Sequence, residues 1–145
     1  RSFGLVSFDA DKFKNFNDNH GHDAGDMVLR AIGEKLRDVM SDGEVCCRIG
    51  GEEFAVLVPK ADLARAVELA EMLRETIAAT QVRYHDGPLP RVTISAGVSA
   101  FPTSGMTPQA LLKRADEALY RAKEAGRNSV CRADAPPAKG VARRK

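Results

Sequence analysis

The stretch VCCRIGGEEFAVLVP occupies residues 45–59 and is the most informative part of the chain. Two short runs, 45–49 and 54–59, are rich in apolar and β-branched residues, and Gly-Gly-Glu-Glu separates them at 50–53. Short β-favouring runs on either side of a glycine-led turn predict a β-hairpin. The turn of this hairpin would carry two adjacent carboxylates, so the segment bears on both the fold and a candidate site.

Working outward, hydrophobic periodicity and end signals predict helices and strands on both sides of the hairpin. Before it we expect a strand over 4–8 that stops at Asp9, a polar, partly helical stretch over 12–22, and a helix from an N-cap at Asp23 to Asp42-Gly43. After it we expect a helix that starts at Asp62, a loop or second hairpin over 81–91 with Asp86-Gly87-Pro88, a strand over 92–100, a helix from Thr107-Pro108 to Gly126, and a strand over 129–132. This order, without an internal repeat, predicts an α+β sandwich in which helices cover an antiparallel or mixed sheet.

Composition favours one globular domain. The chain has 145 residues, of which 43% are hydrophobic and 29% charged, so its core needs no disulfide or metal to be stable. The last fourteen residues hold five basic residues and one acid, whereas the rest hold 17 basic and 19 acidic residues. The net charge of +2 is therefore a property of the tail, and we expect no nucleic-acid partner. We predict a domain over 1–132 and a disordered basic tail over 133–145.

Cysteine usage and hydropathy bear on the compartment. Three cysteines cannot all pair internally, so we expect Cys46, Cys47 and Cys131 to be small buried or half-buried residues in a reducing compartment. No apolar run approaches the roughly 18 residues of a membrane span, and no signal peptide opens the chain. We expect a cytoplasmic domain of a longer protein, and that parent protein could itself be tethered to a membrane.

Several acids are candidate metal ligands. Asp9 ends the first predicted strand, Asp11 follows it, and Glu52 and Glu53 lie in the hairpin turn. Carboxylates that converge repel one another unless a cation lies between them, and oxygen ligands without Cys or His suit magnesium. Since magnesium also accepts phosphate oxygens, a nucleotide polyphosphate is the expected ligand. Taken singly, each acid is also what a solvated turn would contain.

Two other groups fit a nucleotide. Asn17 and Asp26 together offer donors and acceptors that suit the edge of guanine, although Asn17 could equally cap a turn and Asp26 could favour a helix N-terminus. His22 beside them is also typical of a turn. Lys123 and Arg127 are four residues apart on one helical face, where they could hold phosphates or simply stabilise a helix C-terminus.

These features together resemble the GGDEF domain of diguanylate cyclases, with the signature turn in its GGEEF form. The matching blocks span about residues 3–132 and are FDADKFK at 8–14, NDNHGHDAGD at 17–26, RIGGEEF at 48–54, VTISAGVS at 92–99, and the segment 112–128. The resemblance implies a fold like the palm of nucleotidyl cyclases and polymerases, with about five mainly antiparallel strands wrapped by helices. It implies the condensation of two GTP into cyclic di-GMP, with release of two pyrophosphates, as a signalling output.

The resemblance also implies residue roles. Two divalent metal ions per site, Mg²⁺ or Mn²⁺, would be held by Asp9, the Ala10 carbonyl and Glu52. Glu53 would be a further ligand or assist deprotonation of the attacking 3′-hydroxyl, which makes Glu52 and Glu53 the catalytic pair. The implied substrate contacts are Asn17 and Asp26 to guanine, His22 in the pocket, Phe13, Lys14, Lys123 and Arg127 to phosphates, and Gly50 and Gly51 in the turn.

The implied reaction needs more than one copy of the domain. Each domain would bind one GTP, so two copies would face each other in a transient homodimer, which an upstream sensor domain would control. Ser41 and Glu44 stand where many family members have the Arg and Asp of an inhibitory product site, so we expect no such site. The alternatives are a non-catalytic GTP-binding or partner-binding regulatory module, and another metal-dependent nucleotidyl cyclase or polymerase palm.

Overall fold

The computed structural model describes residues 1–41, 43–85 and 87–134. The strands are β1 (Phe3–Ala10), β2 (Val45–Arg48), β3 (Glu53–Pro59), β4 (Arg83–Tyr84), β5 (Gly87–Pro88), β6 (Ile94–Phe101) and β7 (Val130–Arg132). The helices are α1 (Phe13–His20), α2 (His22–Val39), α3 (Leu63–Ala78) and α4 (Pro108–Glu124). The main sheet has the order β2-β3-β1-β6-β7, and only the β6–β7 pair is parallel. The predicted α+β sandwich with a mainly antiparallel five-stranded sheet is therefore confirmed.

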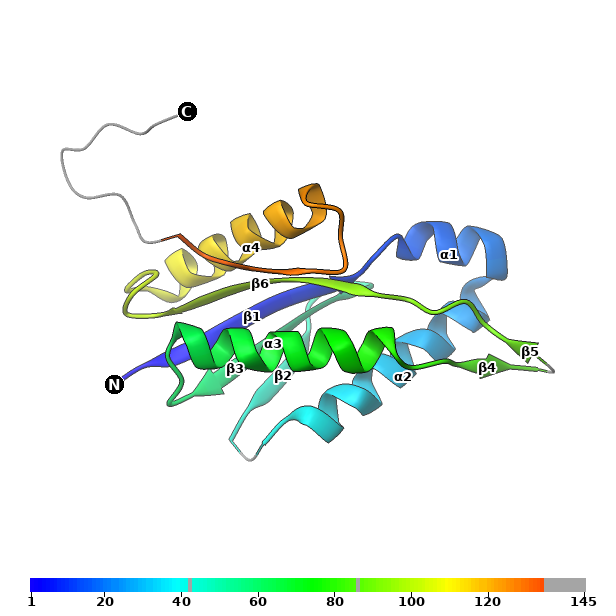
Figure 1. Ribbon diagram of the computed structural model, residues 1–145, viewed down its shortest axis with the longest axis horizontal. Coiled ribbons are helices and arrows are strands. Elements are labelled where there is room, and N and C mark those ends of the chain that lie inside the picture. The colour runs from blue at the N-terminus through cyan, green and yellow to red at the C-terminus, as the bar shows by residue number, and fades with distance from the viewer. Residues whose placement is uncertain (42, 86, 135–145) are drawn as a thin grey trace.

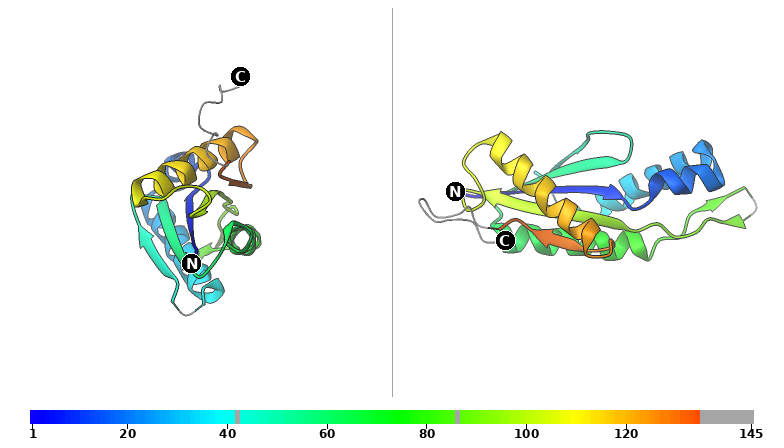
Figure 2. Two further views of the ribbon diagram at one scale, coloured as in Figure 1. Left: turned by 90° about the vertical axis from the view of Figure 1, so that its left-hand side faces the viewer. Right: turned by 90° about the horizontal axis from the view of Figure 1, so that it is seen from above.

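Helices cover both faces of this sheet, with β1 at its centre. Figure 1 and the end-on view in Figure 2 show α4 on one face and α2 and α3 on the other. Side chains alternate between the faces along β1. Val6 and Phe8 point into the main core with α2 and α3, whereas Ser7 and Asp9 reach α4 through hydrogen bonds to Asp116 and Lys123. The α4 face of β1 thus carries polar groups toward a helix that can meet them.

Helix α4 lies directly against the sheet because β6 presents little side chain beneath it. A Cβ atom on Gly97 would collide with the backbone of Ala115 and Leu119 in α4. Serine residues flank this glycine on the same face, at 95 and 99, and both are fully buried. The close contact fixes the course of α4, and with it the side chains near the C-terminal end of the helix.

Local signals determine where two of the four described helices, α3 and α4, begin. Asp62 accepts a hydrogen bond from the Arg65 backbone N–H at 2.9 Å, and Thr107 accepts one from the Ala110 N–H at 3.0 Å, as predicted. The prediction of Asp23 as an N-cap is wrong, because α2 begins at His22 and follows Gly21. Gly21 breaks the chain between α1 and α2 at φ +91°, which leaves Asp23 in the first turn of α2.

Other expectations differ in detail. The alternative of a second hairpin over 81–91 is confirmed by β4 and β5, and β6 starts at Ile94 rather than at residue 92. Cys46 and Cys131 are half-buried, but the prediction for Cys47 is wrong: it is exposed, because β2 is an edge strand. The predicted turn residues Asp42 and Asp86 lie outside the described residues.

The described chain continues past β7. Ala133 is buried, and its N–H donates to the Val98 carbonyl at 2.7 Å. Asp134 lies 4.0 Å from the Arg121 guanidinium, so described contacts continue past residue 132. The rest of the predicted tail, 135–145, is not among the described residues. Within residues 1–41, 43–85 and 87–134, no helix combines the length and apolar character needed to cross a bilayer.

Candidate active site

Sheet register places the end of β1 beside the β2–β3 turn. Asp9 lies directly opposite Glu53 in the antiparallel β1–β3 pair, and the Ala10 N–H donates to the Glu52 carbonyl at 3.3 Å. One step earlier, the rings of Phe8 and Phe54 stack with centroids 5.0 Å apart. The backbone ladder therefore brings together the four positions predicted to hold metal, from segments more than forty residues apart in the sequence.

The carboxylate of Asp9 is buried and only half satisfied. Asp9 is 4% exposed, its Oδ2 accepts from Lys123 Nζ at 2.7 Å, and its Oδ1 is buried without a hydrogen-bond partner. Burial raises the pKa of Asp9; the hydrogen bond and charge of Lys123 lower it, and the charges of Asp11 and Glu53 raise it further. A buried carboxylate oxygen without a donor is suited to a cation, so Asp9 fits a hard divalent ion.

The donor set around Asp9 suits an ion that keeps water or takes ligands from a substrate. Nowhere in the described part of the chain do three or more His, Cys, Asp or Glu side chains form a ready metal cage. The carboxylates of Asp9 and Glu53 and nearby backbone oxygens are what the strand end offers. Magnesium, which retains several waters and accepts phosphate oxygens, matches such an incomplete set.

Asp11 was grouped with Asp9, Glu52 and Glu53 as a candidate metal ligand, but its environment differs from theirs. Its carboxylate accepts hydrogen bonds from the hydroxyls of Thr93 and Ser95, both at 2.6 Å, and from the Asn128 N–H at 3.0 Å. Protein donors therefore occupy both of its oxygens. The donors to Asp11 lie 82 to 117 positions away in the sequence, so the sequence alone did not connect them with this carboxylate.

The predicted guanine-reading residues lie at the corner between α1 and α2. Asn17 packs against Gly25, where any Cβ would overlap the Asn17 Oδ1 atom, and that Oδ1 is buried without a partner. Asp26 follows Gly25 directly and is exposed, as is His22 one turn earlier. Asn17 and Asp26 thus share one corner, which is separate from the hydrogen-bonded group around Asp9.

The residues predicted to contact phosphates differ in exposure and in hydrogen bonding. Phe13 is buried and its ring lies parallel to that of Phe16, so it can offer a ligand only its backbone. Lys14 is exposed on α1, and Arg127 is exposed in the turn that follows α4. Lys123 is 34% exposed and is the one of these residues that is bonded to an acid of the site.

The glycine turn at the tip of the hairpin is held by Arg48. Its guanidinium donates to the Gly51 carbonyl from Nε at 3.1 Å and from Nη2 at 2.5 Å, and to the Gly50 carbonyl at 3.3 Å. A Cβ on Gly51 would meet nothing within 4 Å, so that side of the turn is open. Sequence reasoning missed Arg48 as the clamp, although its place just before the two glycines was the available signal.

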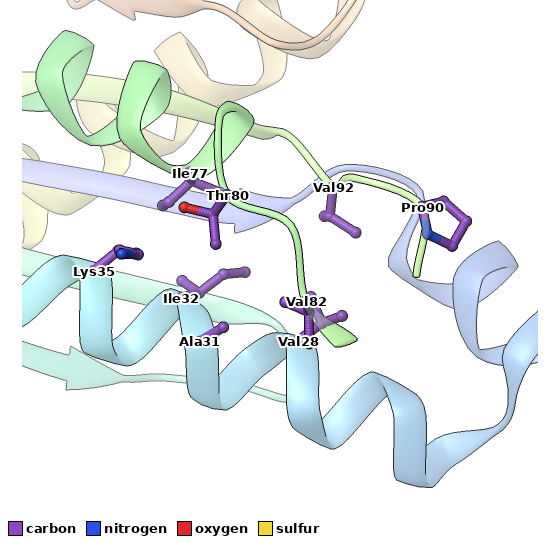
Figure 3. A pocket seen from close by; sticks show the side chains of 9 residues that line it. All are labelled: Val28, Ala31, Ile32, Lys35, Ile77, Thr80, Val82, Pro90 and Val92. Carbon is purple, nitrogen blue, oxygen red and sulfur yellow. The ribbon is translucent and has the colours of Figure 1, made fainter. Parts of the chain in front are cut away.

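Open clefts flank the strand end. One of about 250 Å³ is lined by Ser7, Ile49, Glu53, Leu112, Asp116, Leu119, Tyr120 and Lys123. Another, of about 490 Å³, includes Asp11, Lys12, Arg91, Arg127 and Asn128 in its lining. Figure 3 shows a third hollow between α2 and the end of α3, but it is apolar and has room for about one water molecule. The first two clefts are lined by predicted site residues, and for this reason they are the candidates for a nucleotide.

Ser41 and Glu44, where we expect no inhibitory product site, are hydrogen-bonded to each other. The Ser41 N–H donates to Glu44 Oε1 at 2.8 Å. Neither Ser41 nor Glu44 carries a guanidinium, the group that can bind phosphate through two parallel hydrogen bonds.

Comparison with known proteins identifies the family of this chain. A family model described as "Diguanylate cyclase, GGDEF domain" matches residues 1–129. The response regulator PleD of Caulobacter vibrioides is 46% identical over 123 residues, which cover 84% of this chain and 27% of PleD. The diguanylate cyclase DgcM of Escherichia coli is 41% identical over 130 residues, which cover 90% of this chain and 30% of DgcM. The chain thus spans less than a third of either curated relative.

A solved structure extends the match to three dimensions. The active GGEEF domain of a diguanylate cyclase from Vibrio cholerae superposes with a TM-score of 0.86 at 33% identity, over 94% of this chain and 85% of that chain. Family model, sequence relatives and fold all give the same assignment: this chain belongs to the GGDEF-domain family of diguanylate cyclases.

Proposed function

We propose that this chain condenses two molecules of GTP into cyclic di-GMP, with release of two pyrophosphates. The observation that carries the proposal is the pairing of Asp9 with Glu53 at the end of β1, with one Asp9 oxygen buried and without a partner. That geometry supports the proposal because it could hold the divalent ions that assist nucleotidyl transfer. The names of the relatives, several of which are diguanylate cyclases, support GTP as the substrate.

The residues at the strand end fit divalent ions. Asp9, the Ala10 carbonyl, Glu52 and Glu53 would hold two ions, Mg²⁺ or Mn²⁺. When bound, such ions would lower the pKa of the attacking 3′-hydroxyl and neutralise charge on the phosphates. Glu53 lies directly across from Asp9, and it would accept the hydroxyl proton as an alternative to binding metal.

The cationic side chains would hold the triphosphate. Lys123 reaches Asp9 and also lines the cleft beside Glu53, so it can exchange one anionic partner for another. Arg127 and Lys14 would take the remaining phosphate oxygens together with the Phe13 backbone. Pre-positioned cations of this kind stabilise charge that develops on the leaving pyrophosphate.

The corner between α1 and α2 would select the base. Asn17 Oδ1 is buried and without a partner, so a guanine N–H could supply its missing donor. Asp26 would accept from the neighbouring guanine donors, and His22 would lie in the same pocket. Adenine lacks this donor pattern, so guanine is the favoured base.

Cyclisation of two GTP molecules would take place between two copies of the domain. One copy supplies a single site at the end of β1, and the second 3′-hydroxyl must come from a partner nucleotide. A transient homodimer is therefore part of the proposal, as is control by upstream domains in the longer parent protein.

A direct assay tests the proposal. The full chain, at high protein concentration with Mg²⁺ and GTP, should yield cyclic di-GMP and pyrophosphate in a ratio of about one to two. Glu52→Ala should abolish product without changing the thermal midpoint, and Glu34→Ala, an exposed acid on α2, is the matched control. An active Glu52→Ala variant would overturn the metal assignment.

The same assay separates the alternatives. GTP binding without product at every protein concentration would favour a regulatory module, and turnover of ATP would favour another nucleotidyl cyclase. Cyclic di-GMP added to the reaction should not inhibit it at low concentration, because Ser41 and Glu44 replace the usual pair. Tight inhibition that depends on Glu44 would contradict this expectation.

A further inference from the structure

The carboxylate of Asp11 joins segments that are far apart in the sequence. Its Oδ1 accepts from the Ser95 hydroxyl at 2.6 Å, and its Oδ2 accepts from the Thr93 hydroxyl at 2.6 Å and the Asn128 N–H at 3.0 Å. Its own N–H donates to the Thr93 carbonyl at 2.8 Å. The start of β6 and the turn after α4 are thus both fastened to the residue that lies two positions after Asp9.

The turn that Asp11 holds has an unfavourable backbone. Gly126, Arg127 and Asn128 have φ angles of +115°, +65° and +45°. Asparagine tolerates a left-handed conformation but arginine seldom adopts one, so at Arg127 the surroundings have to support it. Here Asp11 binds the Asn128 N–H, and Arg74 of α3 donates to the Asn128 Oδ1 at 3.0 Å.

Arg127 lies in the middle of this held turn. Its N–H donates to the Ala122 carbonyl at 3.1 Å, and its side chain is exposed beside the cleft that Asp11 and Asn128 also line. The backbone of Arg127 is therefore fixed relative to β1 by its neighbour Asn128. No other acidic side chain bonds to this turn within the described residues.

We propose that Asp11 is a positioning residue for substrate phosphates. By holding the Asn128 N–H, it sets the separation between Arg127 and Asp9, which the triphosphate has to span. This inference rests on the proposed function, in which Arg127 holds terminal phosphates and Asp9 lies on the metal side. A contact that binds ground state and transition state alike affects KM more than kcat, so loss of Asp11 should mainly raise KM.

The choice of substitution separates positioning from metal binding. In Asp11→Asn the amide oxygen can still accept from Thr93 and the Asn128 N–H, and the amide NH₂ can donate to the Ser95 hydroxyl. Asp11→Ala loses all of these hydrogen bonds. A metal ligand would instead need the carboxylate, so both substitutions would then be equally harmful.

The test measures GTP kinetics and the Asn128 backbone amide resonance in the full chain. We expect Asp11→Ala to raise KM about tenfold with less than a threefold change in kcat. Asp11→Asn should recover most of that loss, and in an Arg127→Ala background Asp11→Ala should add less than about twofold. The Asn128 amide should shift in Asp11→Ala but not in Asp38→Ala, whose aspartate is exposed near the end of α2.

Three results would overturn the inference: an unchanged KM and Asn128 amide in Asp11→Ala, equal damage from Asp11→Asn, or an undiminished effect without Arg127. Failure of the unchanged chain to turn over GTP would overturn the proposed function instead. In that case calorimetric binding of inorganic triphosphate still decides the point. Binding should be weaker in Asp11→Ala than in Asp11→Asn, and equal binding would refute the positioning role.

Discussion

Substituting Gly97 by alanine tests how closely α4 must approach the sheet. The added Cβ would overlap backbone atoms of Ala115 and Leu119, so no side-chain rotation can relieve the collision and α4 itself must move. Overpacking of a core typically costs 1–3 kcal/mol. Since backbone is displaced here, we expect the upper end, about 3 kcal/mol.

The matched control is the same substitution at Gly33. This glycine lies inside α2, and a Cβ there would meet nothing within 4 Å. Replacing glycine by alanine in a helix interior stabilises by about 0.5–1 kcal/mol. The two Gly→Ala changes should therefore shift stability in opposite directions.

Thermal unfolding is a sufficient assay. With about 4 °C per kcal/mol for a domain of this size, Gly97→Ala should lower Tm by about 12 °C and Gly33→Ala should raise it by a few degrees. Displacement of α4 should also separate Lys123 from Asp9, now 2.7 Å apart, and reduce turnover beyond the loss of folded protein. A Gly97→Ala Tm close to that of the unchanged chain would refute the reasoning.

Three further predictions concern single side chains. Burial, with a smaller contribution from Cys47, raises the pKa of Cys46 to about 11. A thiol reagent at pH 8 should therefore label the exposed Cys47 first. A fast phase of labelling that remains in Cys47→Ser would contradict this. Burial also raises the pKa of Asp9 above 3.8, so the folded state holds the carboxyl proton more tightly than the unfolded state does. The folded state is therefore destabilised as the pH rises above 3.8 and this proton is lost. Without metal, the free energy of unfolding of Asp9→Asn should therefore rise relative to that of the unchanged chain between about pH 4 and pH 7. A constant difference between the two proteins over this pH range would contradict the prediction. Thr107→Ala should cost about 1 kcal/mol in urea unfolding, because it removes the cap on α4, and an unchanged midpoint would argue against it.

Most features that depend on neighbouring residues were predictable, although Asp23 was wrongly assigned as a cap. The caps Asp62 and Thr107 lie within three residues of the backbone groups they satisfy. The glycine-led turn between β2 and β3 is equally local. Such signals determine where elements begin and end, and their order is enough to indicate an α+β sandwich.

Features that depend on distant partners were not predictable. Asp11 looked like one more acid beside Asp9, and only the folded chain brings Thr93, Ser95 and Asn128 to it. The position of each strand within the sheet could not be predicted from the sequence either. A strand pattern does not say that β2 is at an edge, and this is why the exposure of Cys47 was missed.

The candidate site was predicted as a set of residues but not as a geometry. Carboxylates at a strand end and in a turn drew attention to Asp9, Glu52 and Glu53, but they did so for Asp11 as well. The family resemblance then implied which of these acids would hold metal. Their proximity, however, follows from the β1–β3 register, which pairs Asp9 with Glu53. The bond of Lys123 to Asp9 follows from the path of α4, which depends on Gly97.

The β1–β3 ladder limits which length changes the gene can tolerate. Side chains alternate along a strand, so one codon inserted between Phe3 and Asp9 would turn the Asp9 carboxylate to the opposite face of the sheet, away from Lys123. One codon lost from the pairing part of β3 would likewise shift Glu53 out of step with its partner. Among natural variants of this chain, insertions and deletions should therefore accumulate in the connections around the sheet and be purged from these two strands.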